Sequence, residues 1–241
     1  MKILAIDSSG LVASVALLED GVLKAETIMN NKKTHSQTLL PMLEELKERS
    51  DLDLHTLDAI AIAAGPGSFT GLRIGSATAK GLGLALNKPL VEVPTLEGLA
   101  FNLYGTDKLV CPMMDARRNQ VYTGIYEYVR SGEDYELHTL QEQCAADITE
   151  ILDICNQLGR EVVFLGDGVP VYEDRIREQI KVHYSLAPAH VSRQRAGSIA
   201  ALGAVYASRG RLVSAADHRP EYLRKSQAER EREEESDHKG A

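Results

Sequence analysis

The sequence predicts an α/β fold made of two halves with the same plan. The hydrophobic pattern alternates between short apolar runs, typical of strands, and longer stretches with helical spacing. The order of these segments is three strands, then helix, strand, helix, strand and helix, and it occurs twice along the 241 residues. The two copies share no local sequence identity, so the repeat lies in the order of the elements.

The first copy occupies residues 1–106. Strands are predicted at residues 2–7, 12–18, 22–29, 59–63 and 89–93, and helices at 34–49, 70–86 and 95–104. Asp20-Gly21 is a strong signal for a tight hairpin between the second and third strands. Pro41 falls inside the first helix, so it is expected to kink that helix or to displace its start.

The second copy occupies residues 107–225. Strands are predicted at residues 109–114, 121–129, 136–140, 162–165 and 182–186, and helices at 146–158, 171–180 and 196–209. A duplicated βββαβαβα order is the layout of two ribonuclease-H-like halves, the plan shared by actin, sugar kinases and heat-shock chaperones. Residues 226–241 form a charged tail that is expected to stay disordered.

The charge argues against direct nucleic-acid binding by this chain alone. The net charge is −8, and the last sixteen residues carry six acidic and three basic side chains, so the rest of the chain remains at −5. Binding to the phosphate backbone of a nucleic acid depends on clustered lysines and arginines. We therefore expect this chain by itself to bind nucleic acid only weakly.

Compartment and metal content can also be read from the sequence. The three cysteines contain no close pair, which excludes a disulfide framework and a zinc knuckle. No apolar run approaches the roughly 20 residues of a membrane span, and the first apolar run is too short for a signal peptide. The seven histidines are scattered, with no pair three or four residues apart. A cytoplasmic protein without a histidine-based metal site is expected.

Two glycine-containing turns are candidate nucleotide-binding sites, with Asp7, Ser8, Ser9, Gly65 and Gly67 as the candidate residues. The turn that begins at Asp7 could meet a phosphate through its backbone N–H groups, or it could be a polar hairpin turn that satisfies itself. The turn at Gly65 and Gly67 precedes a helix, but it matches neither the P-loop nor the dinucleotide fingerprint nor the nucleophile elbow. A tight structural turn is the alternative there.

Two further features leave alternatives open. In the helix at 70–86, the residues Gly71, Gly75 and Thr78 fall on one face, where either this protein's own sheet or a partner helix could approach closely. In the second half, Arg117 and Arg118 follow a strand at the position equivalent to the Asp7 turn. They could bind an anion, or they could form ordinary surface ion pairs.

Taken together, these segments resemble the TsaB (YeaZ) family. The resemblance rests on Ile6-Asp7-Ser8-Ser9, residues 35–41, residues 65–75, Asp115-Ala116-Arg117-Arg118, Val121-Tyr122 and the Pro-Glu-Tyr-Leu-Arg segment at 220–224. It implies a non-catalytic subunit that dimerises with TsaD, the protein that places threonylcarbamoyl on the adenosine beside the anticodon of certain tRNAs. It also implies TsaE as the ATPase of the system, self-association when the chain is alone, and tRNA contact only through the complex.

The resemblance further implies that this chain carries no catalytic metal. TsaD has a His-x-x-x-His metal site in the corresponding stretch, where this sequence has Thr95 and Leu99. Neither side chain replaces imidazole on iron or zinc. No cofactor of its own is expected, although ATP or ADP could bind at the partner interface.

The first-half helices are the expected interface for both TsaD and a second copy of the chain. The expected contact residues are His35, Leu39, Leu40, Met42, Leu43, Leu46, Gly71, Leu72, Gly75, Thr78 and Leu82. The alternative function is a small ATP-dependent phosphotransferase of the actin-like fold. That function would need a phosphate loop in each half, and Gly166-Asp167-Gly168 is the remaining candidate in the second half.

Overall fold

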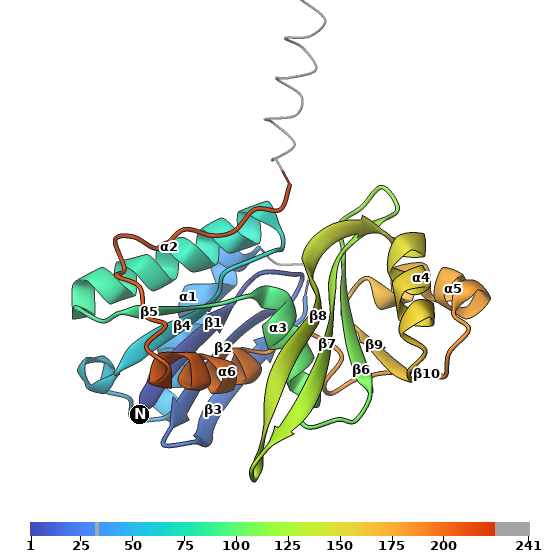
Figure 1. Cartoon of the computed structure of the whole chain (residues 1–241). Coiled ribbons are helices and arrows are strands. Elements are labelled where there is room, and N and C mark those ends of the chain that lie inside the picture. The colour runs from blue at the N-terminus through green and yellow to red at the C-terminus, as the bar shows by residue number, and fades with distance from the viewer. Residues whose placement is uncertain (32–33, 225–241) are drawn as a thin grey trace, which may run out of the picture.

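The computed structural model describes residues 1–31 and 34–224, which form two five-stranded sheets (Figure 1). The strand orders are β3-β2-β1-β4-β5 and β10-β9-β6-β7-β8, so each half repeats the same order around its first strand. The strands are β1 Lys2–Asp7, β2 Ala13–Glu19, β3 Val22–Met29, β4 Ala59–Ala63, β5 Leu90–Val93, β6 Leu109–Asp115, β7 Gln120–Ser131, β8 Asp134–Asp147, β9 Val162–Leu165 and β10 Tyr184–Leu186. The duplicated ribonuclease-H-like plan is confirmed.

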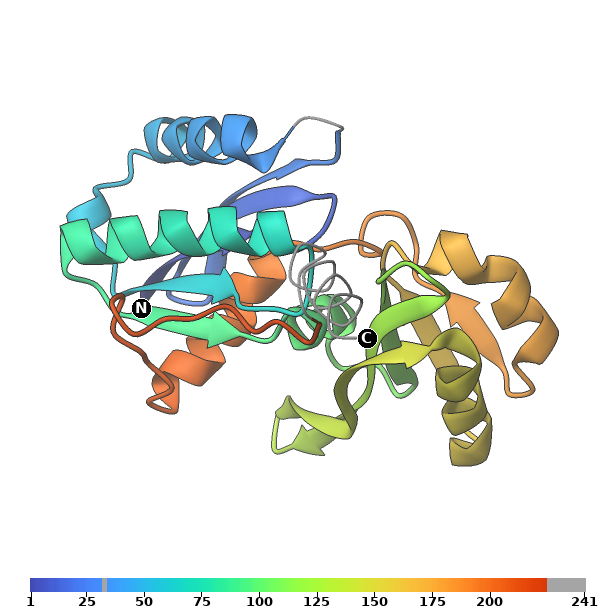
Figure 2. The ribbon, with the colours of Figure 1, turned by 90° about the horizontal axis from the view of Figure 1, so that it is seen from above.

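Helices cover the outer faces of both sheets and fill the space between them (Figure 1). The helices are α1 His35–Arg49, α2 Phe69–Leu86, α3 Thr95–Ala100, α4 Ile148–Leu158, α5 Val169–Gln179 and α6 Ala196–Ser208, with short 3₁₀ turns at Leu54–Thr56 and Phe101–Leu103. Helices α1 and α2 lie side by side on the first sheet (Figure 2), and α4 and α5 cover the second.

The last helix of each half packs on the sheet of the other half. Helix α6 follows the second half in the sequence, but its Ile199 and Ala200 are buried against β1, β4 and β5. Helix α3 closes the first half, and its Leu96 is buried against β6 and β7 of the second. The two helices meet at Gly98, where a Cβ would lie less than 3.0 Å from Ile199. The packing of each half therefore depends on the other, while the boundary near residues 105–107 stays a prediction.

Among the differences from the sequence-based expectation, two have a clear physical reason. Helix α1 runs unbroken through Pro41. Pro41 has no N–H to donate to the Gln37 carbonyl, but both residues lie on the exposed side of the helix, where water can reach that carbonyl. Strand β8 extends to Asp147 rather than ending at 140, since it pairs along the whole of β7 through two register shifts. Asp147 then caps α4 by accepting a hydrogen bond from the Thr149 N–H at 2.8 Å.

The predicted disordered tail at 226–241 lies outside the described residues. Among residues 1–31 and 34–224, no helix is both long and apolar enough to cross a membrane.

Candidate functional site

The Asp7 turn, at the end of β1, satisfies its own polar groups. The Asp7 side chain is 1% exposed, and its Oδ1 accepts hydrogen bonds from the Ser9 N–H at 2.9 Å and the Ser9 hydroxyl at 2.6 Å. Burial raises the pKa of Asp7 to about 6, against the opposing effect of the Ser9 hydrogen bonds and of nearby His35. These hydrogen bonds support the alternative in which the Asp7 segment is a polar turn that satisfies its own groups.

The turn between β4 and α2 packs backbone to backbone against the Asp7 turn. The Ser68 N–H donates to the Ser9 carbonyl at 2.7 Å. A Cβ on Gly67 would lie less than 3.0 Å from that same carbonyl, and a Cβ on Gly65 would collide with the Glu221 carbonyl. Glycine is required because the two chain segments touch through their backbones. Nucleotide binding at Asp7, Ser8, Ser9, Gly65 and Gly67 stays a prediction.

The second half repeats this arrangement. A Cβ on Gly166 would lie less than 3.0 Å from the Met113 carbonyl at the end of β6, and the Gly168 N–H donates to that carbonyl at 3.0 Å. Between the halves, the Gln194 side chain is 1% exposed and lies against Gly10, and neither polar atom of its amide has a hydrogen-bond partner within the described residues. The glycine turns of both halves therefore serve close packing, and Gln194 fills the space between them.

The two positions at which the resemblance expects metal ligands hold structural residues. Thr95 is fully buried; its Oγ1 accepts from the Gly65 N–H at 3.1 Å, and its own N–H donates to the Gly65 carbonyl at 2.8 Å. Leu99 is buried in the cluster between α3 and the second sheet. Burial raises the pKa of Glu97, whose carboxylate accepts a hydrogen bond from the Tyr206 hydroxyl. Within the described part of the chain, no group of three or more His, Cys, Asp or Glu side chains is placed to hold a metal ion.

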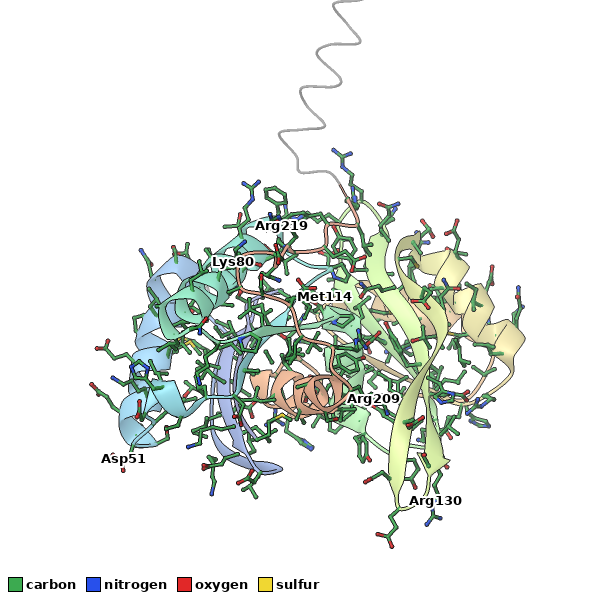
Figure 3. The ribbon with its side chains drawn as sticks, turned by 60° about the vertical axis from the view of Figure 1, so that its left-hand side comes forward. Asp51, Lys80, Met114, Arg130, Arg209 and Arg219 are labelled. Atoms are coloured by element: carbon green, nitrogen blue, oxygen red, sulfur yellow. The ribbon has the colours of Figure 1, made fainter. Side chains whose placement is uncertain are left out.

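Residues 213–224, here called the C-terminal strap, run along α2 and over the glycine turn to the second half (Figure 1). Lys80 of α2 donates to two strap carbonyls, at 3.0 and 3.1 Å (Figure 3). The Glu221 N–H donates to the Ala64 carbonyl at 2.7 Å, and the Arg224 guanidinium donates to the Ala116 carbonyl at 2.6 Å. The strap has no hydrophobic period, so periodicity alone could not have found it.

Buried His218 fastens the strap to the first half. Its two ring nitrogens lie 2.6 Å from a Glu92 carboxylate oxygen and 2.9 Å from the Ser76 hydroxyl. We expect His218→Ala to lower the free energy of unfolding by about 2 kcal/mol, because it leaves both partners unpaired. Urea unfolding should show this loss, with His190→Ala as the control that stays within about 0.5 kcal/mol of the wild type. Equal stability of the two variants would contradict the role of His218.

The expected interface residues divide into buried and accessible sets. Seven are buried in the protein's own core: Leu39, Met42, Leu43, Leu46, Gly71, Leu72 and Gly75. In the chain alone, α1 buries its apolar stripe in the first core, and Gly71 and Gly75 of α2 lie against Ser8. The role of these seven residues as partner contacts stays a prediction. Leu40 is 59% exposed, and His35, Thr78 and Leu82 are partly exposed.

Another face of α2 is the accessible one. Arg73, Ala77, Gly81 and Leu84 are exposed and recur at helical spacing. A Cβ on Gly81 would meet nothing within 4 Å, and Leu84 is 61% exposed. The sequence-based interpretation chose the Gly71 and Gly75 face instead, because glycines that pack on a strand turn and glycines that face solvent look alike in sequence.

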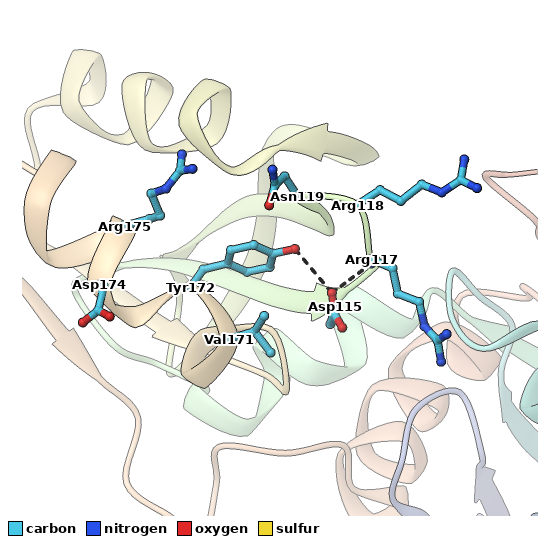
Figure 4. Close-up of a pocket in the computed structure, with 8 residues that line it drawn as sticks. All are labelled: Asp115, Arg117, Arg118, Asn119, Val171, Tyr172, Asp174 and Arg175. Carbon is cyan, nitrogen blue, oxygen red and sulfur yellow. Dashed lines mark hydrogen bonds between the residues drawn. The ribbon is translucent and has the colours of Figure 1, made fainter.

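A pocket of about 550 Å³ lies at the β6–β7 turn, beside α5 (Figure 4). Its lining residues are Asp115, Arg117, Arg118, Asn119, Val171, Tyr172, Asp174 and Arg175. Asp115 Oδ1 accepts hydrogen bonds from the Arg117 N–H at 2.8 Å and the Tyr172 hydroxyl at 3.4 Å. Neither arginine of the turn forms an ion pair with a described residue, so the surface ion-pair alternative is wrong for that part of the chain.

The chain is similar to proteins that are named and solved. A family model described as "tRNA N6-adenosine threonylcarbamoyltransferase" (TsaD) matches residues 23–232. The Bacillus subtilis protein named tRNA threonylcarbamoyladenosine biosynthesis protein TsaB is 35% identical over 95% of this chain and 96% of its own length. The Escherichia coli protein of the same name is 30% identical, with the same coverage of both chains.

Solved structures agree with these sequence matches. A Pseudomonas aeruginosa protein described as similar to peptidase YeaZ superposes with a TM-score of 0.78 and 29% identity, covering 92% of this chain and 99% of its own. YeaZ from the same organism gives a TM-score of 0.74 with 28% identity and the same coverage. The duplicated fold, the glycine turns and near-full-length identity to named relatives lead to one conclusion: the chain belongs to the TsaB (YeaZ) family.

Proposed function

We propose that this chain is a non-catalytic subunit required for threonylcarbamoylation of the tRNA adenosine next to the anticodon, and that it acts by dimerising with TsaD. The relatives that cover nearly the whole chain are named for threonylcarbamoyladenosine biosynthesis, which supports the pathway. The observation that carries the non-catalytic role is the pair Thr95 and Leu99. Thr95 accepts a hydrogen bond from the glycine turn, and Leu99 is buried in the core. These are the two positions where the resemblance expects metal ligands in TsaD.

The proposed docking surface is the outer side of the first-half helices. The exposed α2 face at Ala77, Gly81 and Leu84 has small side chains at its centre, where a partner helix can approach closely. Leu40 adds an exposed apolar side chain on α1. The same surface would serve a second copy of the chain, so a homodimer and the TsaD heterodimer would exclude each other.

The remaining components follow from this role. TsaE would join the assembled complex, tRNA would be engaged through that complex, and the protein would work in the cytoplasm. The chain would need no cofactor of its own, and any bound ATP or ADP would lie at the partner interface. The purified chain should carry no stoichiometric iron or zinc, and metal analysis that found one tightly held ion per chain would count against the proposal.

Reconstituted transfer of threonylcarbamoyl to tRNA is the direct test. We expect TsaD to require this chain, and the chain alone to transfer nothing.

Gly81→Trp should overpack a helix crossing at a cost of about 1–3 kcal/mol and so weaken TsaD association roughly 5- to 150-fold, while the melting temperature stays unchanged. Asp153→Asn, on the exposed side of α4, is the control. Full TsaD affinity in Gly81→Trp would remove α2 from the interface.

The phosphotransferase alternative makes a different prediction. A kinase would bind ATP tightly at the glycine turns and turn it over, but Gly67 and Gly166 are covered by the chain's own carbonyl groups. Isothermal titration of the isolated chain with ATP separates the two functions. Stoichiometric binding followed by hydrolysis or transfer would favour the enzyme.

A further inference from the structure

Three arginines around the β6–β7 pocket have no acidic partner. Among the described residues, the guanidinium groups of Arg117, Arg118 and Arg175 form no ion pair and no hydrogen bond. By contrast, Arg177, two residues further along α5, is paired with Glu173 at 2.9 Å. Other described arginines without an acidic partner contact a carbonyl or an aromatic ring, so these three differ in having no protein partner and are open to an external anion.

The backbone of the turn is strained in the segment that presents two of these arginines. Arg117, Arg118 and Asn119 have φ values of 61°, 57° and 58°, three successive residues in the left-handed region. For residues other than glycine, that conformation is unfavourable, and strain of this kind persists where the surrounding structure or a function holds it. Here the Asp115 carboxylate fixes the turn through the Arg117 N–H.

The directions of the side chains indicate what kind of anion they fit. In Figure 4, Arg117 and Arg118 extend from the turn on one side of the pocket, and Arg175 extends from α5 on the other. They spread apart rather than converging on one point. A single phosphate would be held by groups that converge on it, whereas a nucleic-acid strand offers several phosphates in a row. Asp115 is already engaged by its own partners.

We propose that the β6–β7 turn and α5 form a contact surface for the phosphate backbone of RNA, through Arg117, Arg118 and Arg175. This inference rests on the proposed function, because that function places a tRNA next to the chain. Such contacts are independent of sequence, and they position the nucleic acid rather than select it. A short basic surface on a chain of net charge −8 gives weak binding alone and adds to the partner's surface in the complex.

The test compares two triple variants of the full-length chain that remove the same charge. R117Q/R118Q/R175Q removes the free arginines, and R49Q/R160Q/R177Q removes three that are already paired with glutamates. Binding of tRNA is measured without TsaD, by fluorescence anisotropy, at salt concentrations from about 25 to 200 mM. Over this range, contacts to phosphates weaken strongly as salt is added. We expect the first variant to lose roughly tenfold to 100-fold in affinity at low salt, and to reduce the slope of log K against log salt by about 2–3.

The control triple variant should keep the wild-type slope, since its arginines do not line the pocket. Equal slopes for the two variants, or no measurable binding of tRNA by the wild type at low salt, would overturn the inference. ATP and inorganic phosphate are tested as competitors at matched ionic strength, and saturable displacement by either would assign the site to a small phosphate ligand instead. This binding measurement contains no TsaD. Its result can therefore be interpreted even if the reconstituted assay shows that the chain does not act with TsaD.

Discussion

Replacing Gly75 by leucine is expected to lower the free energy of unfolding by about 3 kcal/mol and to leave association intact. A Cβ on Gly75 would lie less than 3.0 Å from the Ser8 hydroxyl oxygen, and within 3.2 Å of the Ile62 side chain on β4. That hydroxyl donates to the Gly71 carbonyl at 2.9 Å, so it cannot move away without breaking the bond that ties the Asp7 turn to α2. The gain in helix propensity, about 0.8 kcal/mol, is smaller than this clash.

Gly81→Leu is the matched control, because it makes the same change in the same helix where nothing lies within 4 Å. It should leave stability unchanged or raise it slightly, since leucine is the better helix former. Thermal melts should separate the two variants by roughly 6–12 °C for a chain of this size. A Gly75→Leu protein that melts like the wild type but no longer associates would show that this face meets a partner after all.

The sequence predicted the order of the elements because each strand and helix has its own hydrophobic period. It did not predict which sheet α6 would join, because helix placement depends on contacts between halves that are far apart in the chain. One local signal was present. Helix α6 is apolar nearly all round, as Ala200, Leu202 and Gly203 illustrate, and such a helix favours a largely buried position. Packing on the first sheet and against α3 buries most of α6, although Val205 stays 36% exposed.

The candidate site was harder to predict than the fold. Asp7 and the glycines were recognised as a functional turn or a tight turn, but only the tertiary contacts show that Gly67 packs on the Ser9 carbonyl. On α1, the stripe that includes Leu39 and Leu43 was too wide to assign to one contact by counting, because it packs on both the sheet and α2. Leu40, the next residue after Leu39, lies outside this stripe and is 59% exposed.

Asp7→Asn is expected to raise the free energy of unfolding above pH 6 by up to about 3 kcal/mol, and to change it little below pH 4. Burial favours the neutral carboxyl, so the pKa of Asp7 is about 6 in the folded protein, against 3.8 in the unfolded chain. As pH rises from 4 to 6, the unfolded chain releases this proton first, and the folded protein loses stability. Above pH 6 both states are ionised, and about two units at 1.36 kcal/mol each make up the whole cost.

Asparagine removes this cost because it is neutral at every pH and keeps an oxygen at the Asp7 Oδ1 position. That oxygen can still accept from the Ser9 N–H and hydroxyl, so the turn retains its hydrogen bonds. Urea unfolding at four pH values between 4 and 8 should show the difference between variant and wild type growing with pH, whereas Asp153→Asn on the exposed side of α4 should give a flat difference. If Asp7→Asn is instead less stable at pH 8, the ionised carboxylate has a favourable partner in the folded protein, and the turn does more than hold itself together.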